Sequence, residues 1–131
     1  MTDLEQAQAS GIAPWDLKVA TLSDFHVTVF EDRYPVTAGH LLFVPNYNTI
    51  SVIVDAMDSA MRHGQALTEQ GRCDGFNVGV NMGRSAGQTV MYPHVHLIPR
   101  RVGDCPDPTG GVRGVITWQQ NYKSSSYSKP T

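Results

Sequence analysis

Apolar residues recur along this chain with two spacings, and the spacing of three and four residues predicts a single long helix. Between about Ser51 and Gln70 they fall three and four residues apart, as on the buried face of a helix. This face comprises Val52, Ile53, Ala56, Met57, Ala60, Met61 and Leu67. Gly71 follows directly, and glycine is common just after the last turn of a helix. We therefore expect one long helix that ends near Gln70.

Short runs of β-branched, aromatic and other apolar residues predict four strands. These runs span residues 25–30, 40–44, 75–80 and 90–98. Residues 31–39 predict a loop, because Pro35 cannot donate a backbone hydrogen bond and Gly39 permits unusual dihedral angles. The order strand, strand, helix, strand, strand predicts an α+β fold with a mostly antiparallel sheet.

The length of 131 residues suits one domain with a real core. Apolar residues make up 40% of the chain and charged residues 17%, which is typical of a globular protein rather than a disordered one. Turn-forming residues dominate 103–111, so we expect the regular core to end before this segment.

The net charge narrows the class of binding partner, and the cysteine content narrows the cellular compartment. A formal net charge of -2 disfavours general nucleic-acid binding, although a small phosphorylated ligand needs only a few local donors. Cys73 and Cys105 are the only cysteines, too few to cross-link a domain of this size, which favours a reducing compartment. The first residues lack a basic flank before an apolar run, and no eighteen apolar residues occur together. We expect a cytoplasmic protein without a membrane span.

His94 and His96 are separated by one residue, so their side chains share one face if this segment is a strand. Two imidazoles on one surface fit three interpretations: a catalytic pair, two solvated histidines, or half of a metal site that other residues complete. The pair alone does not decide between them.

The residues before this pair favour a site for an anion. Gly83, Gly87, Gln88 and Thr89 bring flexible backbone, an amide and a hydroxyl to the start of the same strand. Such donors can surround a phosphate group. Without the histidines, a tight hairpin turn would be the preferred explanation of the same glycines.

Residues 87–90, Gly-Gln-Thr-Val, followed after three residues by His-Val-His-Leu-Ile-Pro-Arg, resemble the signature of the histidine-triad (HIT) superfamily of nucleotide hydrolases and transferases. Residues 32–45 resemble the upstream strand, loop and strand of that family, and Asn81 stands where the family has an asparagine before the glycine loop. The resemblance implies a single HIT-like domain over 1–131, with a core of about 17–101 and a C-terminal extension of about 102–131, similar in part to a tail in some bacterial-type members.

The resemblance also implies a nucleotidyl-transfer mechanism. His94 occupies the middle position of the triad, whose histidine attacks the α-phosphorus and forms a nucleotidyl-histidine that water hydrolyses. A neutral imidazole is a competent nucleophile near neutral pH. His96 matches the final histidine, which hydrogen-bonds the phosphate or the departing oxygen. The implied substrates are dinucleoside polyphosphates or nucleoside phosphoramidates, with a purine nucleotide as the bound group.

Further roles follow from the resemblance, residue by residue. Catalytic roles would fall on His94, His96, Gln88 and Thr89, and nucleotide contacts on Asp32, Asn81, Gly87, Gln88 and Thr89. Asp32 falls where the family binds the ribose hydroxyls, for which a carboxylate is a good acceptor. His40 matches a histidine that orients the triad. These roles require no metal and no other cofactor.

The chain departs from the family's pattern at the first histidine of the triad. Position 92 is a tyrosine, followed by Pro93. The main-chain carbonyl of Tyr92 is retained to orient His94, and its hydroxyl can both donate and accept. Pro93 removes one ladder donor and predicts an irregular strand. The family's N-terminal Cys-x-x-Cys is also missing, so we expect no structural zinc.

Two rival functions stay open: a nucleotide-binding regulatory protein with weak or no catalysis, and a metal-binding protein that uses the histidine pair. The resemblance further implies a homodimer whose two sheets join. We interpret His26 and His63 as ordinary surface or satisfied histidines, and Trp15 and Trp118 as packing residues.

Overall fold

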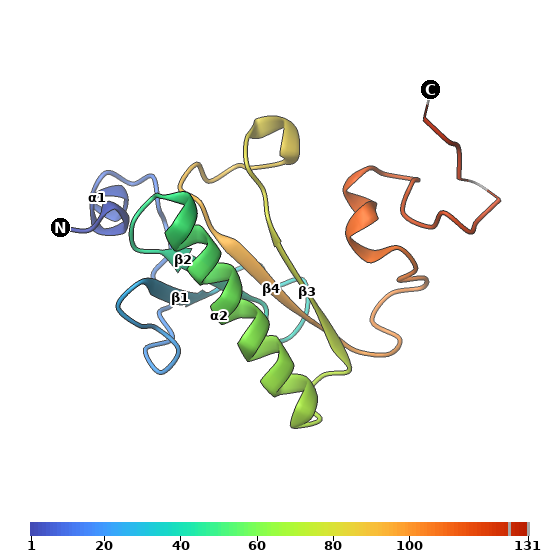
Figure 1. Cartoon of the computed structure of the whole chain (residues 1–131), viewed down its shortest axis with the longest axis horizontal. Helices are drawn as coiled ribbons and strands as arrows, with labels where there is room; N and C mark the ends of the chain where they lie inside the picture. The colour runs from blue at the N-terminus through green and yellow to red at the C-terminus, as the bar shows by residue number, and fades with distance from the viewer. Residues whose placement is uncertain (126, 131) are drawn as a thin grey trace. The chain divides into compact units, whose positions relative to one another are not determined.

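The structure is a computed structural model that describes residues 1–125 and 127–130. The elements are α1 (Asp3–Ala9), β1 (Val27–Glu31), β2 (Leu41–Pro45), α2 (Ile50–Glu69), β3 (Gly75–Val80), η1 (Arg84–Ala86), β4 (Val95–Arg100) and η2 (Gly111–Val115). The four strands form one antiparallel sheet in the order β1-β2-β4-β3 (Figure 1). The predicted α+β fold with a mostly antiparallel sheet and one long helix is confirmed.

Local hydrogen bonds explain where the strands begin. β1 starts two residues later than predicted, because the Asp24 carboxylate accepts the backbone N–H groups of His26 and Val27 in a turn. β4 starts at Val95, so its predicted beginning at residue 90 is wrong. Residues 90–92 form bends and residues 93–94 are irregular, since Pro93 has no N–H and the carbonyl of Val90 accepts a hydrogen bond from the Gln88 side chain.

Helix α2 covers one face of the sheet and encloses the main core with it (Figure 1). Its buried members come from β1, β2, α2 and β4: Val27, Val29, Leu41, Phe43, Ile53, Ala56, Ala60, Val95 and Leu97. Gly64 lets the helix approach β3 closely, because a Cβ there would lie 2.6 Å from the ring of Phe76. The register pairs Leu42 with His96, so both side chains lie on the opposite face, away from α2.

The N-terminal segment covers part of that opposite face. Helix α1 begins with a capping box in which the Thr2 hydroxyl accepts from the Glu5 backbone and the Glu5 carboxylate accepts from the Thr2 backbone. It packs into a second apolar cluster, called here the N-terminal cluster: Leu4, Ala7, Ala13, Phe30, Leu42, Val44 and Tyr92, with Trp15 packed against it. Beyond this cluster, His96 and Ile98 on the same face of β4 are partly exposed.

The chain divides into two compact units, Met1–Arg101 and Val102–Thr131. In the second unit, the Arg113 guanidinium lies 5.2 Å from the ring centre of Tyr122 and 5.6 Å from that of Tyr127. Trp118 has a positive φ of 72° and is 83% exposed, so its predicted role in packing is wrong. The reason is that this turn-rich unit has no apolar core among its described residues that could enclose an indole.

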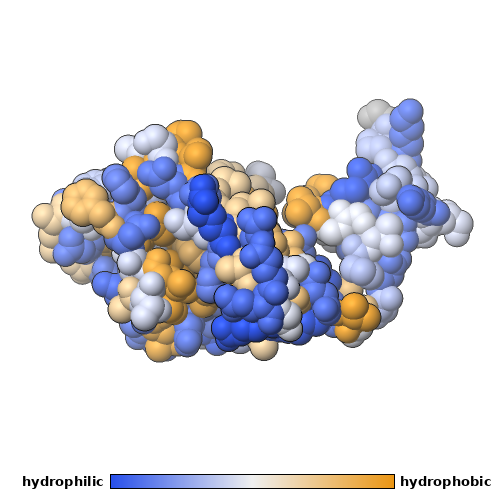
Figure 2. Space-filling view, turned by 60° about the horizontal axis from the view of Figure 1, so that its bottom comes forward, coloured by the Kyte–Doolittle hydropathy of each residue, from blue (hydrophilic) through white to orange (hydrophobic). Residues whose placement is uncertain are grey.

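The surface in Figure 2 is mostly hydrophilic and is interrupted by apolar patches. Among the described residues, no helix combines the length and apolarity that crossing a membrane requires.

Candidate active site

A cavity of about 650 Å³ opens on the face of the sheet that α2 does not cover. Its walls are Pro14, Trp15, Asp16, Glu31, Asp32, Arg33, Tyr34, Leu42, Asn81, Gly87, Gln88, Thr89, Val90, His94 and His96. A cavity of this size falls in the ordinary range for a small-molecule site. It brings together every residue predicted to be catalytic or to contact the nucleotide, whereas the side chains of His40 and Tyr92 do not line it.

His94 lies just before β4 and is held by its own backbone neighbour. Its Nδ1 is 2.8 Å from the carbonyl oxygen of Tyr92. Because a carbonyl can only accept, Nδ1 carries the proton and Nε2 carries the lone pair. Burial lowers the pKa of His94, while the bond to Tyr92 and the charge of Asp32 act in the opposite direction. The result is a neutral imidazole with an unprotonated Nε2, which is the form that a nucleophile requires.

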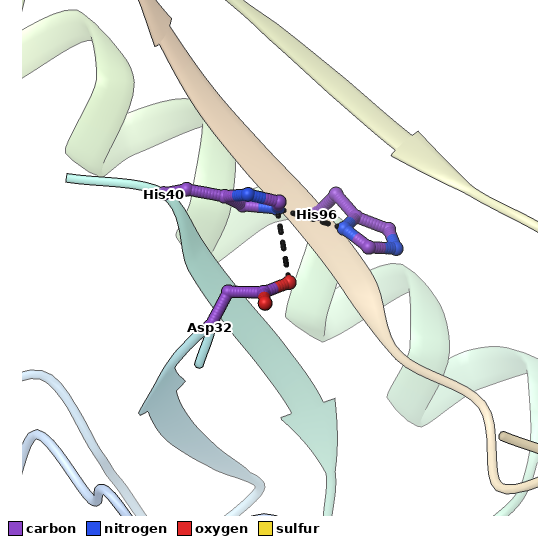
Figure 3. A group of neighbouring side chains, drawn as sticks. All are labelled: Asp32, His40 and His96. Carbon is purple, nitrogen blue, oxygen red and sulfur yellow. Dashed lines mark hydrogen bonds and ion pairs between the residues drawn. The ribbon is translucent and has the colours of Figure 1, made fainter. Parts of the chain in front are cut away.

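His40 and His96 form a relay that begins at a backbone amide. The N–H of Val36 donates to Nδ1 of His40 over 3.1 Å, so the ring proton of neutral His40 sits on Nε2. That Nε2 donates in turn to Nδ1 of His96 over 2.9 Å (Figure 3). Neutral His96 therefore carries its own proton on Nε2. The relay gives His96 a hydrogen-bond donor on the ring nitrogen that is not bonded to His40.

Asp32 begins the loop between β1 and β2 and lies beside His40. One carboxylate oxygen accepts the backbone N–H of Tyr34 over 2.8 Å, and the other lies 3.4 Å from Nε2 of His40 (Figure 3). The side chain is only partly buried and lies on the wall of the cavity. Its second oxygen thus remains available to accept hydrogen bonds from a ligand.

The three histidines all resist protonation. Burial lowers the pKa of His40, and the charge of Asp32 opposes this only in part. Burial, followed by the proximity of His94 and His40, lowers the pKa of His96 to about 4. A proton on any one ring would repel a proton on the next, so the cluster is neutral at physiological pH.

Asp32, His40 and His96 are also the one group of three potential metal ligands whose atoms lie within 4.8 Å of one another in the described part of the chain. The hydrogen bonds argue against this use. A metal on Nε2 of His40 would force the ring proton onto Nδ1, where it would face the N–H of Val36. Metal-bound histidines instead present that second N–H to an acceptor. The donor set fits a proton relay better than a metal centre.

The glycine loop before β4 is held by the side chain of Gln88. Its Oε1 accepts the N–H of Gly83 over 2.8 Å, and its Nε2 donates to the carbonyl of Val90 over 3.1 Å. Gly83 and Gly87 have φ values of 96° and 91°, which favour glycine. Gln88 is buried and braces the loop, while Thr89 is exposed and lies on the cavity wall.

The side chain of Tyr92 points away from the cavity. It is buried in the N-terminal cluster, where its hydroxyl donates to the carbonyl of Pro45 over 2.6 Å. Burial raises the pKa of this hydroxyl, so it is a protonated donor. Tyr92 therefore acts on the site through its main-chain carbonyl, which orients His94, while its hydroxyl serves the packing of the domain.

Several residues of the cavity wall were not predicted from the sequence, and Trp15 is the one whose ring contacts His94. Trp15 was interpreted as a packing residue, and it does pack on Phe30 and Tyr92. Its ring also contacts the imidazole of His94, with ring centres 4.9 Å apart. No signal near Trp15 in the sequence indicates this contact, because it depends on how the N-terminal segment folds over the sheet. His26 and His63 lie outside the cavity, as interpreted.

Comparison with known proteins agrees with this architecture. The HIT domain matches residues 17–103, and the chain belongs to that family. The zinc-bound histidine triad family protein of Mycobacterium smegmatis has a similar structure, with a TM-score of 0.62 and 30% identity over 77% of this chain and 81% of that one.

Two named enzymes are among the similar sequences. An AP-4-A phosphorylase of Mycobacterium tuberculosis is 39% identical over 80 residues, which cover 54% of this chain and 40% of the relative. A bis(5'-nucleosyl)-tetraphosphatase of Schizosaccharomyces pombe is 32% identical over 82 residues, which cover 57% of this chain and 45% of the relative. This chain thus matches less than half the length of either enzyme.

Proposed function

We propose that the protein is a nucleotide hydrolase or nucleotidyl transferase that acts through a nucleotidyl-His94 intermediate. The observation that carries this proposal is the pair of opposite tautomers in one cavity. The backbone leaves a lone pair on Nε2 of His94 and a proton on Nε2 of His96. The ring centres of these histidines are 5.1 Å apart, so a nucleophile and a donor for the leaving group stand side by side.

The reaction proceeds in two displacements. In the first, Nε2 of His94 forms a bond to the α-phosphorus, and the bond from that phosphorus to the leaving group breaks. The leaving atom keeps the electron pair, and the Nε2–H of His96 hydrogen-bonds it as charge builds there. In the second, water attacks the phosphorus, the phosphorus–nitrogen bond breaks and His94 regains its lone pair. Water supplies the proton that the leaving group takes and the hydroxyl that the nucleotide gains.

The cavity wall supports a nucleoside 5'-phosphate derivative as the substrate. Asp32 offers a carboxylate oxygen for ribose hydroxyls, and Thr89 and Gly87, on the same cavity wall, offer a hydroxyl and a backbone N–H for phosphate oxygens. The relatives named for dinucleoside polyphosphate chemistry favour dinucleoside polyphosphates with a purine base, and a phosphoramidate is the second candidate. We propose that no metal or other cofactor takes part, because the relay supplies the donor.

We also propose a homodimer in which two sheets join. β3 is at the edge of the sheet, and all six of its residues are partly exposed. An apolar stripe on α2 supports this, since Ile50, Val54 and Met61 are 72%, 55% and 51% exposed at helical spacing. Met61 was expected on the buried face of the helix and lies at its exposed side instead. A free strand edge beside an apolar stripe suits a second copy of the chain. The cytoplasm is the proposed compartment.

A nucleotide-binding regulatory protein with little catalysis is the alternative. The position of Gln88 favours it, because both ends of its amide already hydrogen-bond the glycine loop and at most one N–H of Nε2 is left for a phosphate. Nucleotide binding at Asp32 and Thr89 would survive without turnover in such a protein.

The test is a substrate panel of diadenosine polyphosphates and an adenosine phosphoramidate, with His94→Asn beside the wild type. His63→Asn is the matched control, because His63 lies on α2 outside the cavity. The proposal expects release of a nucleoside monophosphate by wild type and His63→Asn, and at least about a thousandfold less by His94→Asn. Equal product from wild type and His94→Asn with every substrate would refute it, and tight nucleotide binding without turnover would establish the regulatory alternative.

A further inference from the structure

Trp15 stands against the ring of the proposed nucleophile. Its indole and the imidazole of His94 have centres 4.9 Å apart and planes inclined at 57°. Among the described residues, the other ring in contact with His94 is His96, at 5.1 Å. His94 is only 9% exposed, so little water reaches its ring.

The indole is held in place from behind. Its ring centre lies 6.0 Å from that of Phe30 and 6.4 Å from that of Tyr92, both members of the N-terminal cluster. The side chain of Gln8 donates to the carbonyl of Trp15 over 3.4 Å and ties the residue to α1. These contacts hold the indole against His94.

The charge of His94 changes during the proposed reaction. When Nε2 bonds to phosphorus while Nδ1–H still donates to Tyr92, the ring becomes a positively charged imidazolium. The face of an indole attracts a cation within about 6 Å of its centre, most strongly where water is excluded.

We propose that Trp15 is a positioning residue that holds the His94 ring for attack and stabilises the imidazolium of the nucleotidyl-enzyme. This inference rests on the proposed function, because the charged ring exists only if His94 is the nucleophile. It assigns the N-terminal segment a role in the chemistry, since α1 and its cluster position the indole.

Fluorinated tryptophan tests the electrostatic part without changing the packing. The chain has two tryptophans, so a Trp118→Phe background leaves Trp15 as the only site of replacement. Trp118 is exposed and does not line the cavity, so its replacement should leave the rate unchanged. Monofluoro-, difluoro- and trifluorotryptophan withdraw increasing charge from the ring face. We expect the single-turnover rate of nucleotidyl-enzyme formation to fall stepwise, by about tenfold over the series.

Substitution tests the same point independently. Trp15→Phe keeps an aromatic face and should remain within about threefold of the wild type, whereas Trp15→Leu removes the face and should be about tenfold slower. A flat fluorination series, or equal rates for Trp15→Leu and Trp15→Phe, overturns the inference. If His94→Asn abolishes turnover while the series is flat, only the role of Trp15 fails; if His94→Asn retains full turnover, the proposed function fails with it.

Discussion

The imidazole of His40 donates to that of His96 over 2.9 Å, and the direction of this bond is set by a backbone amide four residues before His40. The amide of Val36 occupies Nδ1 of His40, so the ring proton must sit on Nε2. His40 and His96, which are 56 positions apart in the sequence, are therefore both protonated on Nε2. The relay explains why His96 is a donor toward the cavity although it is neutral.

Replacing His40 by leucine should remove this control. Without a donor at Nδ1, His96 can place its proton on either nitrogen, and we expect the turnover rate to fall by roughly tenfold. Nitrogen-15 spectra of the imidazole rings report the change directly, since wild-type His96 should be protonated on Nε2 alone. Val36→Ala is the control, because Val36 is 70% exposed and alanine keeps the amide. An unchanged His96 tautomer in His40→Leu would contradict the relay.

The histidine cluster should make the domain less stable in acid. The pKa values of His40, His94 and His96 are lowered in the folded protein, mainly by burial. Unfolded histidines take up protons below about pH 6.5, and the folded rings resist this uptake. The stabilising contribution is therefore complete above about pH 6.5 and is lost as the pH falls toward the folded value, about 4 for His96.

Urea unfolding of wild type and His96→Gln at several pH values measures this contribution. The wild type should lose more free energy of unfolding than the variant between about pH 7 and pH 5. His26→Gln removes an exposed histidine outside the cavity and should follow the wild type. A variant that loses as much stability as the wild type over this range would show that His96 is not the source.

Tyr92 should tolerate loss of its hydroxyl better than conversion to the histidine of the family pattern. Tyr92→Phe removes the bond to the Pro45 carbonyl and should cost about 1 kcal/mol of unfolding free energy, with turnover nearly unchanged because the carbonyl of residue 92 remains. Tyr92→His would place an imidazole in the N-terminal cluster and should lose more stability without gaining rate. A tenfold faster Tyr92→His enzyme would contradict this assignment.

The sequence predicted the features that depend on local periodicity and missed those that depend on distant contacts. The apolar spacing after residue 50 predicted α2 to within about one residue, and the four strands appeared in their predicted order. The predicted start of β4 was wrong because the Gln88 side chain hydrogen-bonds the backbone of Gly83 and Val90. The residue type of Gln88 does not indicate these bonds.

The same distinction holds for the site. Asp32, His94 and His96, which the resemblance to the family singled out, line one cavity. The amide of Val36 and the ring of Trp15 were not predictable, since a backbone donor has no signature and Trp15 reaches His94 only after the N-terminal segment folds over the sheet.

The most direct test of the proposed chemistry is to stop the reaction during turnover of a diadenosine polyphosphate and identify the modified peptide by mass spectrometry. A histidine-linked phosphoramidate is labile in acid and stable in alkali, so the quench must be alkaline. The proposed mechanism predicts one nucleoside monophosphate group on the peptide that contains His94, located on that residue and absent from His94→Asn. Turnover that leaves no adduct on His94, or an adduct on any other residue, would contradict it.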